Sequence, residues 1–219
     1  MNRQTKMISL FLFPVMTEQL QTLSKTPFET DQAAIDFLKI LLPALDQDMQ
    51  NQGLYQIGVD AFKNNAGNTI LKSHFLETVF SGEDHNVAHY YFARKLLKEN
   101  LITIEEVHQR IECLTTKDVK PPVGPDFKLL ILATPLLFFE KEINATSPDD
   151  FKKYYSQVST IFRSSPMIKR MALEWNTPLN IRNCCYDLMS GNITFEPDNL
   201  EKLVEIAGDP AKLPQIPVY

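Results

Sequence analysis

Hydrophobic residues recur at intervals of three and four along most of the chain, which is the spacing of amphipathic helices. The stretch after Thr30 and Asp31 shows this most clearly. Its apolar positions share one side of a helix: Ala34, Ile35, Phe37, Leu38, Leu41, Leu42 and Leu45. Thr30 is a suitable N-cap for this helix. Pro43, inside the pattern, predicts a kink or a break.

Similar patterns predict short helices at residues 54–63 and 69–80, separated by an Asn- and Gly-rich turn at residues 64–68. No stretch alternates β-branched and polar residues over the length of a strand. The sequence therefore predicts an all-α protein, a multi-helix bundle of roughly eight to ten short helices, arranged as one bundle or as two sub-bundles.

Two capping boxes stand close together in the middle of the chain. Ser81 and Asp84 open a predicted helix that ends at Asn100, a residue that tolerates left-handed backbone. Thr103 and Glu106 repeat the box at the start of the next helix. Because the connection is so short, we expect the two helices to form an αα-hairpin.

A proline-rich segment, VKPPVGPD at residues 119–126, predicts a linker because it disfavours helix and has little to bury. It divides an N-terminal helical region (1–118), which contains the hairpin at about residues 82–115, from a C-terminal helical region (127–219). The second region ends in an extended tail that contains three prolines, DPAKLPQIPVY.

Two other segments are strongly apolar. Residues 129–139 are about half the length that a bilayer requires and predict a buried core helix, kinked or broken at Thr134-Pro135. Residues 7–16 are a candidate signal-peptide core, but Pro14 interrupts them and no small-residue cleavage pattern follows. We therefore expect no transmembrane segment and no signal peptide.

The composition is that of an ordinary folded protein: 219 residues, 44% hydrophobic and 22% charged. The formal net charge of −5 disfavours a nucleic-acid binder that neutralises phosphates. Three cysteines, of which Cys184 and Cys185 are adjacent, form no disulfide framework and favour a cytoplasmic location. We expect Cys113, which Ile111 and Leu114 flank, to be buried in the core.

The histidines are the main candidates for chemistry. His85 and His89 are four residues apart, and His74 and Glu77 lie three apart on the preceding predicted helix. If these helices pack side by side, His74, His85 and His89 could bind a transition metal, and His85, His89 and Glu77 could act in acid–base catalysis. The chain has no HExxH motif. The favoured interpretation is therefore partly buried, hydrogen-bonded histidines and no cofactor.

A second candidate is a basic-aromatic segment from Lys152 to Arg182, which contains six basic residues and one acid, Glu174. Such mixtures bind acidic protein surfaces or anionic lipids such as phosphoinositides. The alternative is a solvated face whose charges are balanced by neighbouring acids. The candidate interaction residues are Lys152, Lys153, Arg163, Lys169, Arg170, Trp175 and Arg182.

The end of the chain gives one resemblance to a known class of protein. Glu201 and Glu205 precede a short terminus with the apolar residues Ile216 and Val218. Together with the capped short helices, this resembles bacterial effector proteins that carry a C-terminal type IV secretion signal. The resemblance involves only the chain from residue 200 onward. It implies secretion into a host cytosol and a host-protein partner, and it assigns no functional residue.

The leading hypothesis is a non-enzymatic α-helical protein-interaction module that binds another protein with an acidic surface. One alternative is a metal-dependent or acid–base enzyme centred on His74, His85 and His89. A second alternative is an anionic-lipid-binding module.

Overall fold

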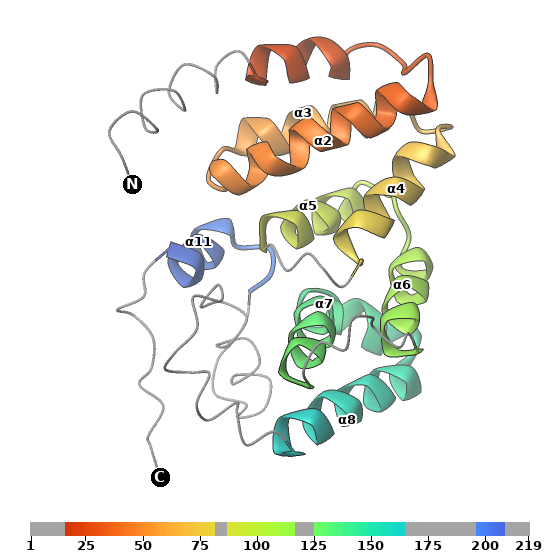
Figure 1. The fold of residues 1–219 in the computed structure, drawn as a ribbon, viewed down its shortest axis with the longest axis vertical. Coiled ribbons are helices and arrows are strands. Elements are labelled where there is room, and N and C mark those ends of the chain that lie inside the picture. The colour runs from red at the N-terminus through yellow and green to blue at the C-terminus, as the bar shows by residue number, and fades with distance from the viewer. Residues whose placement is uncertain (1–15, 82–86, 117–124, 165–195, 209–219) are drawn as a thin grey trace.

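The computed structural model describes residues 16–81, 87–116, 125–164 and 196–208. Over these ranges it contains nine helices and no strand, which confirms the all-α prediction. The first helix covers residues 16–24. The others, labelled in Figure 1, are α2 (Asp31–Gln47), α3 (Gln52–Asn64), α4 (Thr69–Val79), α5 (Val87–Lys98), α6 (Ile104–Thr116), α7 (Pro125–Thr146), α8 (Pro148–Ser164) and α11 (Leu200–Gly208).

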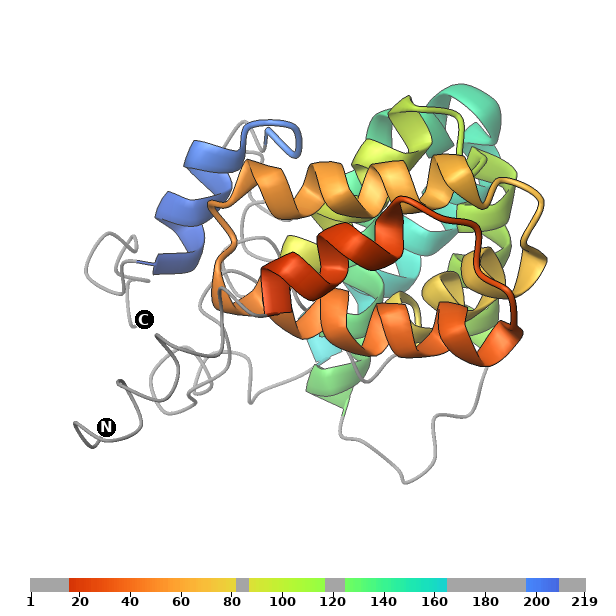
Figure 2. The same cartoon turned by 90° about the horizontal axis from the view of Figure 1, so that it is seen from above.

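The helices are stacked in layers around α5. Helix 16–24 lies over α2 and α3, as Figure 2 shows, and α5 packs beneath them. The opposite side of α5 contacts α7 and α11, and α8 covers α7. One buried apolar cluster extends from Leu20 in the first helix to Leu203 in α11. The helices on both sides of the predicted linker therefore share a core.

Close packing around α5 depends on a glycine. A Cβ atom at Gly58 in α3 would lie 2.5 Å from Cζ of Phe92 and 3.0 Å from Cδ2 of Leu41. The Phe92 ring is itself held by edge-to-face contacts with Phe62 and Phe75, at centroid distances of 5.9 and 5.3 Å. This arrangement leaves no room for a methyl group at residue 58.

The predicted cap of α2 is confirmed, whereas the predicted break is wrong. The backbone N–H of Ala33 donates to Oγ1 of Thr30 over 3.1 Å. The helix then runs through Pro43 to Gln47 without a break. Pro43 is on the exposed side, while Leu45 is fully buried. Burial of the apolar face keeps the helix intact despite the missing backbone donor.

The predicted signals between α5 and α6 are confirmed. Asn100 has a left-handed φ of 56°, and the N–H of Leu101 donates to the carbonyl of Leu96 over 2.9 Å, as in a Schellman motif. Glu106 N–H donates to Oγ1 of Thr103 over 3.2 Å, and Thr103 N–H donates to the Glu106 carboxylate over 2.8 Å. The other box, at Ser81 and Asp84, falls mainly on residues 82–86, outside the described ranges.

The position of α6 differs from the expected hairpin. Its main contacts are with α4 and α7 rather than with α5. The physical reason is that α5 is buried on nearly every side by α2, α3, α7 and α11, so little of its surface is left for α6. Helix α7 begins at Pro125, inside the segment predicted as a linker. The division into two regions at residues 119–126 stays a prediction.

Helix α7 contains the apolar run 129–139, and its kink is not at the predicted place. The non-helical residue is Phe139 (φ −120°, ψ 15°), four residues beyond Pro135. The side chains of Phe138 and Phe139 are both fully buried, and the carbonyl of Phe138 accepts a hydrogen bond from the Arg94 guanidinium. The kink thus coincides with a carbonyl that bonds outside its own helix. Among the described helices, none is both long and apolar enough to cross a membrane.

Candidate functional site

Helix α8 carries the described part of the basic-aromatic segment. Lys152 and Lys153 are both exposed. Arg163 belongs to α8, but its side chain is outside the described part of the structure. The other predicted interaction residues, Lys169, Arg170, Trp175 and Arg182, lie in the range 165–195, also outside it.

The aromatic residues of this segment divide between the core and the surface. Tyr154 and Val158 are buried and hold α8 against the bundle. Phe151 and Tyr155 are only half-buried, and their rings stack with centroids 6.2 Å apart and an interplanar angle of 29°. At about 100° per residue, Lys152 lies about 60° round the helix from Tyr155, whereas Lys153 lies about 160° from it, beside the Tyr154 ring. We name the outer surface of α8, formed by Phe151, Tyr155, Lys152 and, further round the helix, Lys153, the α8 face.

The two lysine ammonium groups of the α8 face make only weak contacts with the rest of the protein. Nζ of Lys152 is 3.5 Å from Oδ1 of Asp149, but the two side chains are 75% and 97% exposed. Ion pairs in such exposed positions contribute little, so this one constrains the Lys152 charge only slightly. Nζ of Lys153 lies 5.9 Å from the centroid of the Tyr154 ring. Both ammonium groups therefore remain accessible to a partner.

The fourth histidine fixes α8 to α6. Nε2 of His108 is 2.9 Å from the Tyr154 hydroxyl and 3.5 Å from Oδ2 of Asp150. Burial, and then the charges of Asp150 and Glu112, raise the pKa of Tyr154 to about 12, so its hydroxyl stays protonated. Both contacts use the same ring nitrogen, whereas a catalytic His–Asp pair needs the second nitrogen for its orienting carboxylate. We interpret this cluster as an anchor for α8.

His89 has a structural contact of the same kind. It is buried, and its Nε2 lies 3.0 Å from the Leu42 carbonyl and 2.8 Å from Oδ1 of Asp46. A carbonyl only accepts, so Nε2 carries the proton and has no lone pair for a metal. The hydrogen bonds join α5 to the end of α2.

The other candidate ligands do not gather around His89 in the described ranges. His74 is half-buried in α4, and Glu77 is exposed and pairs with Arg110 over 3.2 Å. His85 lies outside the described residues. Across the described ranges, no group of three or more His, Cys, Asp or Glu side chains is placed to hold a metal.

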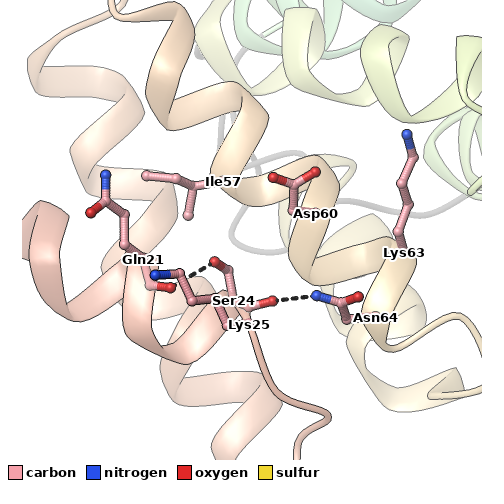
Figure 3. A pocket seen from close by; sticks show the side chains of 7 residues that line it. All are labelled: Gln21, Ser24, Lys25, Ile57, Asp60, Lys63 and Asn64. Carbon is pink, nitrogen blue, oxygen red and sulfur yellow. Dashed lines mark hydrogen bonds between the residues drawn. The ribbon is translucent and has the colours of Figure 1, made fainter.

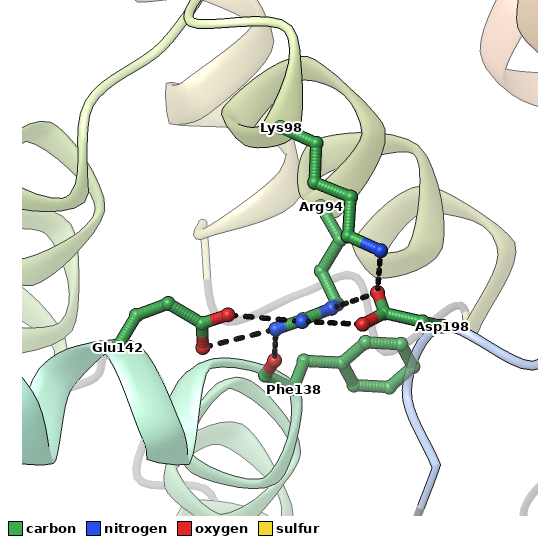
Figure 4. A network of polar contacts seen from close by, with 5 residues as sticks. All are labelled: Arg94, Lys98, Phe138, Glu142 and Asp198. Atoms are coloured by element: carbon green, nitrogen blue, oxygen red, sulfur yellow. Dashed lines mark hydrogen bonds and ion pairs between the residues drawn. The ribbon is translucent and has the colours of Figure 1, made fainter.

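A buried arginine joins three distant parts of the chain, as Figure 4 shows. The Arg94 side chain is 4% exposed. Its Nη1 and Nη2 donate to the two carboxylate oxygens of Glu142 in α7, over 3.1 and 2.9 Å. Nε and Nη2 donate to the two oxygens of Asp198, over 2.7 and 2.9 Å, and Nη1 also donates to the Phe138 carbonyl. All five guanidinium N–H groups thus have an acceptor, which satisfies this buried charge.

Arg94 and Lys98 hold the Asp198 carboxylate in its charged form. The hydrogen bond from Arg94 lowers the pKa of Asp198, and a second one from Lys98, at 3.0 Å, acts in the same direction. Burial alone would lower the pKa of Arg94, but hydrogen bonds to Asp198 and Glu142 outweigh burial and raise it. Asp198 directly precedes Asn199, whose Oδ1 caps α11 by accepting from Lys202 N–H over 3.2 Å. The network therefore fixes the start of α11.

Two shallow cavities open on the described part of the surface. The first, of about 490 Å³, lies between helix 16–24 and α3, and Figure 3 shows the side chains that line it. Two of its polar side chains have structural partners: Asn64 donates to the Ser24 carbonyl over 2.8 Å, and Lys63 pairs with Glu99 over 2.6 Å. The second, of about 460 Å³, lies beside the start of α11.

Cys113 corrects one further expectation. It is exposed, not buried. On α6 it points about 100° or more away from Leu114 and Ile111, which are in the core, so neighbours in sequence were a poor guide to its face. Cys184 and Cys185 lie outside the described ranges.

Comparison of the chain with protein families, with curated proteins and with solved structures finds no match.

Proposed function

We propose that the protein is a non-enzymatic α-helical interaction module that binds another protein with an acidic surface, and that it acts as a secreted effector on a host protein. The observation that carries the proposal is the α8 face, where the accessible Lys152 adjoins a half-exposed stacked aromatic pair and Lys153 adds a second accessible charge further round the helix. Aromatic side chains supply apolar contact area in interfaces, and the lysines supply charge complementarity.

The contacts that hold α8 against the bundle support the proposal. Tyr154 is fixed by His108, and Val158 is fully buried, so the helix is held firmly from its inner side. Asp150 adds a second contact between α8 and α6, because its carboxylate lies 3.5 Å from Nε2 of His108. A rigid helix loses little conformational entropy when it binds, which favours affinity.

The test is affinity capture from host-cell extract with the full-length chain and two charge-reversal variants. The first variant is Lys152→Glu with Lys153→Glu. The matched control is Lys25→Glu with Lys39→Glu, which makes the same charge change at two exposed sites, one directly after helix 16–24 and one on α2. We expect a protein partner that is captured by the wild type and by the control, is lost with the α8 variant, and is released by added salt.

Two results would count against the proposal. Equal capture by all three proteins would show that the α8 face is not the binding surface. If liposomes of anionic lipid capture the wild type in an α8-dependent manner and no protein does, the lipid-binding alternative is correct instead.

A further inference from the structure

We propose that α11 occupies a docking surface for an external helix, and that a partner helix with an acid followed by spaced leucines can replace it there. The surface, which we name the Arg94 dock, consists of Arg94 and Lys98 on α5 together with the part of the apolar core against which Leu200 and Leu203 of α11 are buried. It is separate from the α8 face, and the inference does not depend on that face.

The sequence of α11 shows which chemistry the dock accepts. Leu203 is buried at 1% exposure and Leu200 at 8%, and they are three residues apart, so both face the core. Asp198 lies two residues before Leu200 and meets the guanidinium through both of its oxygens. The motif is therefore Asp-x-Leu-x-x-Leu at the start of a helix, with Glu201 and Lys202 exposed.

When α11 leaves and takes Asp198 with it, Arg94 loses two of its five hydrogen bonds and keeps the other three. Glu142 and the Phe138 carbonyl accept from Arg94 independently of Asp198, and both belong to α7. Release of α11 therefore leaves Arg94 paired with Glu142. Breaking a buried ion pair is usually costly because one charge is left buried without a partner, and that does not happen here. A preformed site that keeps its shape favours the binding of another helix with the same acid and leucines.

The attachment of α11 is also limited. Its main described contact is with α5 alone, and Asp198 remains 44% exposed. The cavity of about 460 Å³ lies beneath its start, between Asp198 and Leu200 on one side and Tyr91 and Lys141 on the other. A segment with one main described helix contact and an open cavity at its edge belongs to the part of a fold that opens most readily.

The first test uses the full-length chain and a labelled peptide of residues 196–208. In the wild type, α11 competes with the peptide at an effective concentration on the order of millimolar, which suppresses peptide binding. Leu203→Ala weakens the internal competitor, and we expect that full-length variant to bind the peptide at least about tenfold more tightly, measured by fluorescence anisotropy. A peptide with Asp198→Asn should bind about tenfold more weakly than the natural one.

The matched control is Leu23→Ala, which removes a partly buried leucine from helix 16–24, far from the dock. It should leave peptide binding as in the wild type. If folded Leu203→Ala protein does not bind the peptide, or binds both peptides equally, the proposal is wrong. If size-exclusion chromatography with light scattering shows that the variant forms dimers in place of peptide binding, the occupant is a second copy and the partner proposal is also wrong.

A second test needs no variant and covers the case in which Leu203→Ala fails to fold. Hydrogen exchange of the wild type should show the α11 amides exchanging at least about a hundredfold faster than those of α5, because α11 opens locally. Excess peptide should accelerate exchange in α11 and leave α5 unchanged. Equal exchange in the two helices would mean that α11 leaves only on global unfolding, which would overturn the proposal.

Discussion

Replacing Arg94 by methionine tests the structural importance of the buried network. Methionine keeps most of the volume and removes every donor. The Phe138 carbonyl then loses its donor from Arg94 in a buried position, at a cost of about 1–3 kcal/mol. Glu142 and Asp198 are 31% and 44% exposed, so water replaces part of what they lose, and together they add only about 1 kcal/mol. We expect Arg94→Met to lower the free energy of unfolding by about 2–4 kcal/mol.

The assay is urea unfolding followed by circular dichroism, with Lys39→Met as the matched control. Lys39 pairs with Asp36 at 3.2 Å, but both side chains are more than half exposed, so its removal should leave the free energy of unfolding nearly unchanged. A double-mutant cycle of Arg94→Met with Glu142→Gln should give a coupling energy of about 0.5 kcal/mol, half of what the two carboxylates contribute together. A loss below about 1 kcal/mol for Arg94→Met, or additive effects in the cycle, would refute the reasoning.

The same network predicts a pH dependence of known sign. The pKa of Asp198 is lowered in the folded protein from its ordinary 3.8, chiefly by Arg94. Its contribution to stability is therefore complete above the unfolded pKa and is lost as the pH falls through the lowered folded value. The difference in stability between the wild type and Arg94→Met should consequently shrink as the pH is lowered below about 4.

Two further substitutions test the fold. Gly58→Ala places a methyl group 2.5 Å from the Phe92 ring, so it should destabilise the protein by about 1–3 kcal/mol despite the better helix propensity of alanine; a stabilised protein in thermal unfolding would show that α3 and α5 are packed less closely. Thr103→Ala removes the acceptor for Glu106 N–H and should cost about 1 kcal/mol, and an unchanged melting temperature would contradict the cap.

Local signals in the sequence were sufficient for the ends of several helices. Thr30, Asn100 and the Thr103–Glu106 box act within three or four residues of themselves, so their hydrogen bonds could be predicted without the fold. Proline was less reliable. Pro43 breaks nothing, and the kink of α7 is at Phe139 rather than at Pro135, because tertiary packing and an acceptor for Arg94 determine the backbone there.

The Arg94 network could not be predicted in this way. Its partners Glu142 and Asp198 are 48 and 104 residues away, and no local pattern connects them. Arg94 also lies on the opposite side of α5 from Phe92 and Leu96, so the spacing of these core residues does not indicate that it is buried. One signal was present: Tyr90, Tyr91 and Val87 share the side of Arg94, and a helix with apolar residues on both sides is usually buried.

The most direct test of the central claim is to map where a captured partner binds. Hydrogen exchange of the full-length protein, alone and in complex with the protein partner that the affinity capture identifies, reports the protected surface. The account predicts protection in α8, around Phe151, Lys152 and Tyr155, and its loss when Lys152 and Lys153 are reversed to glutamate. Protection confined to helix 16–24, α2 and α3, with α8 unchanged, would contradict it.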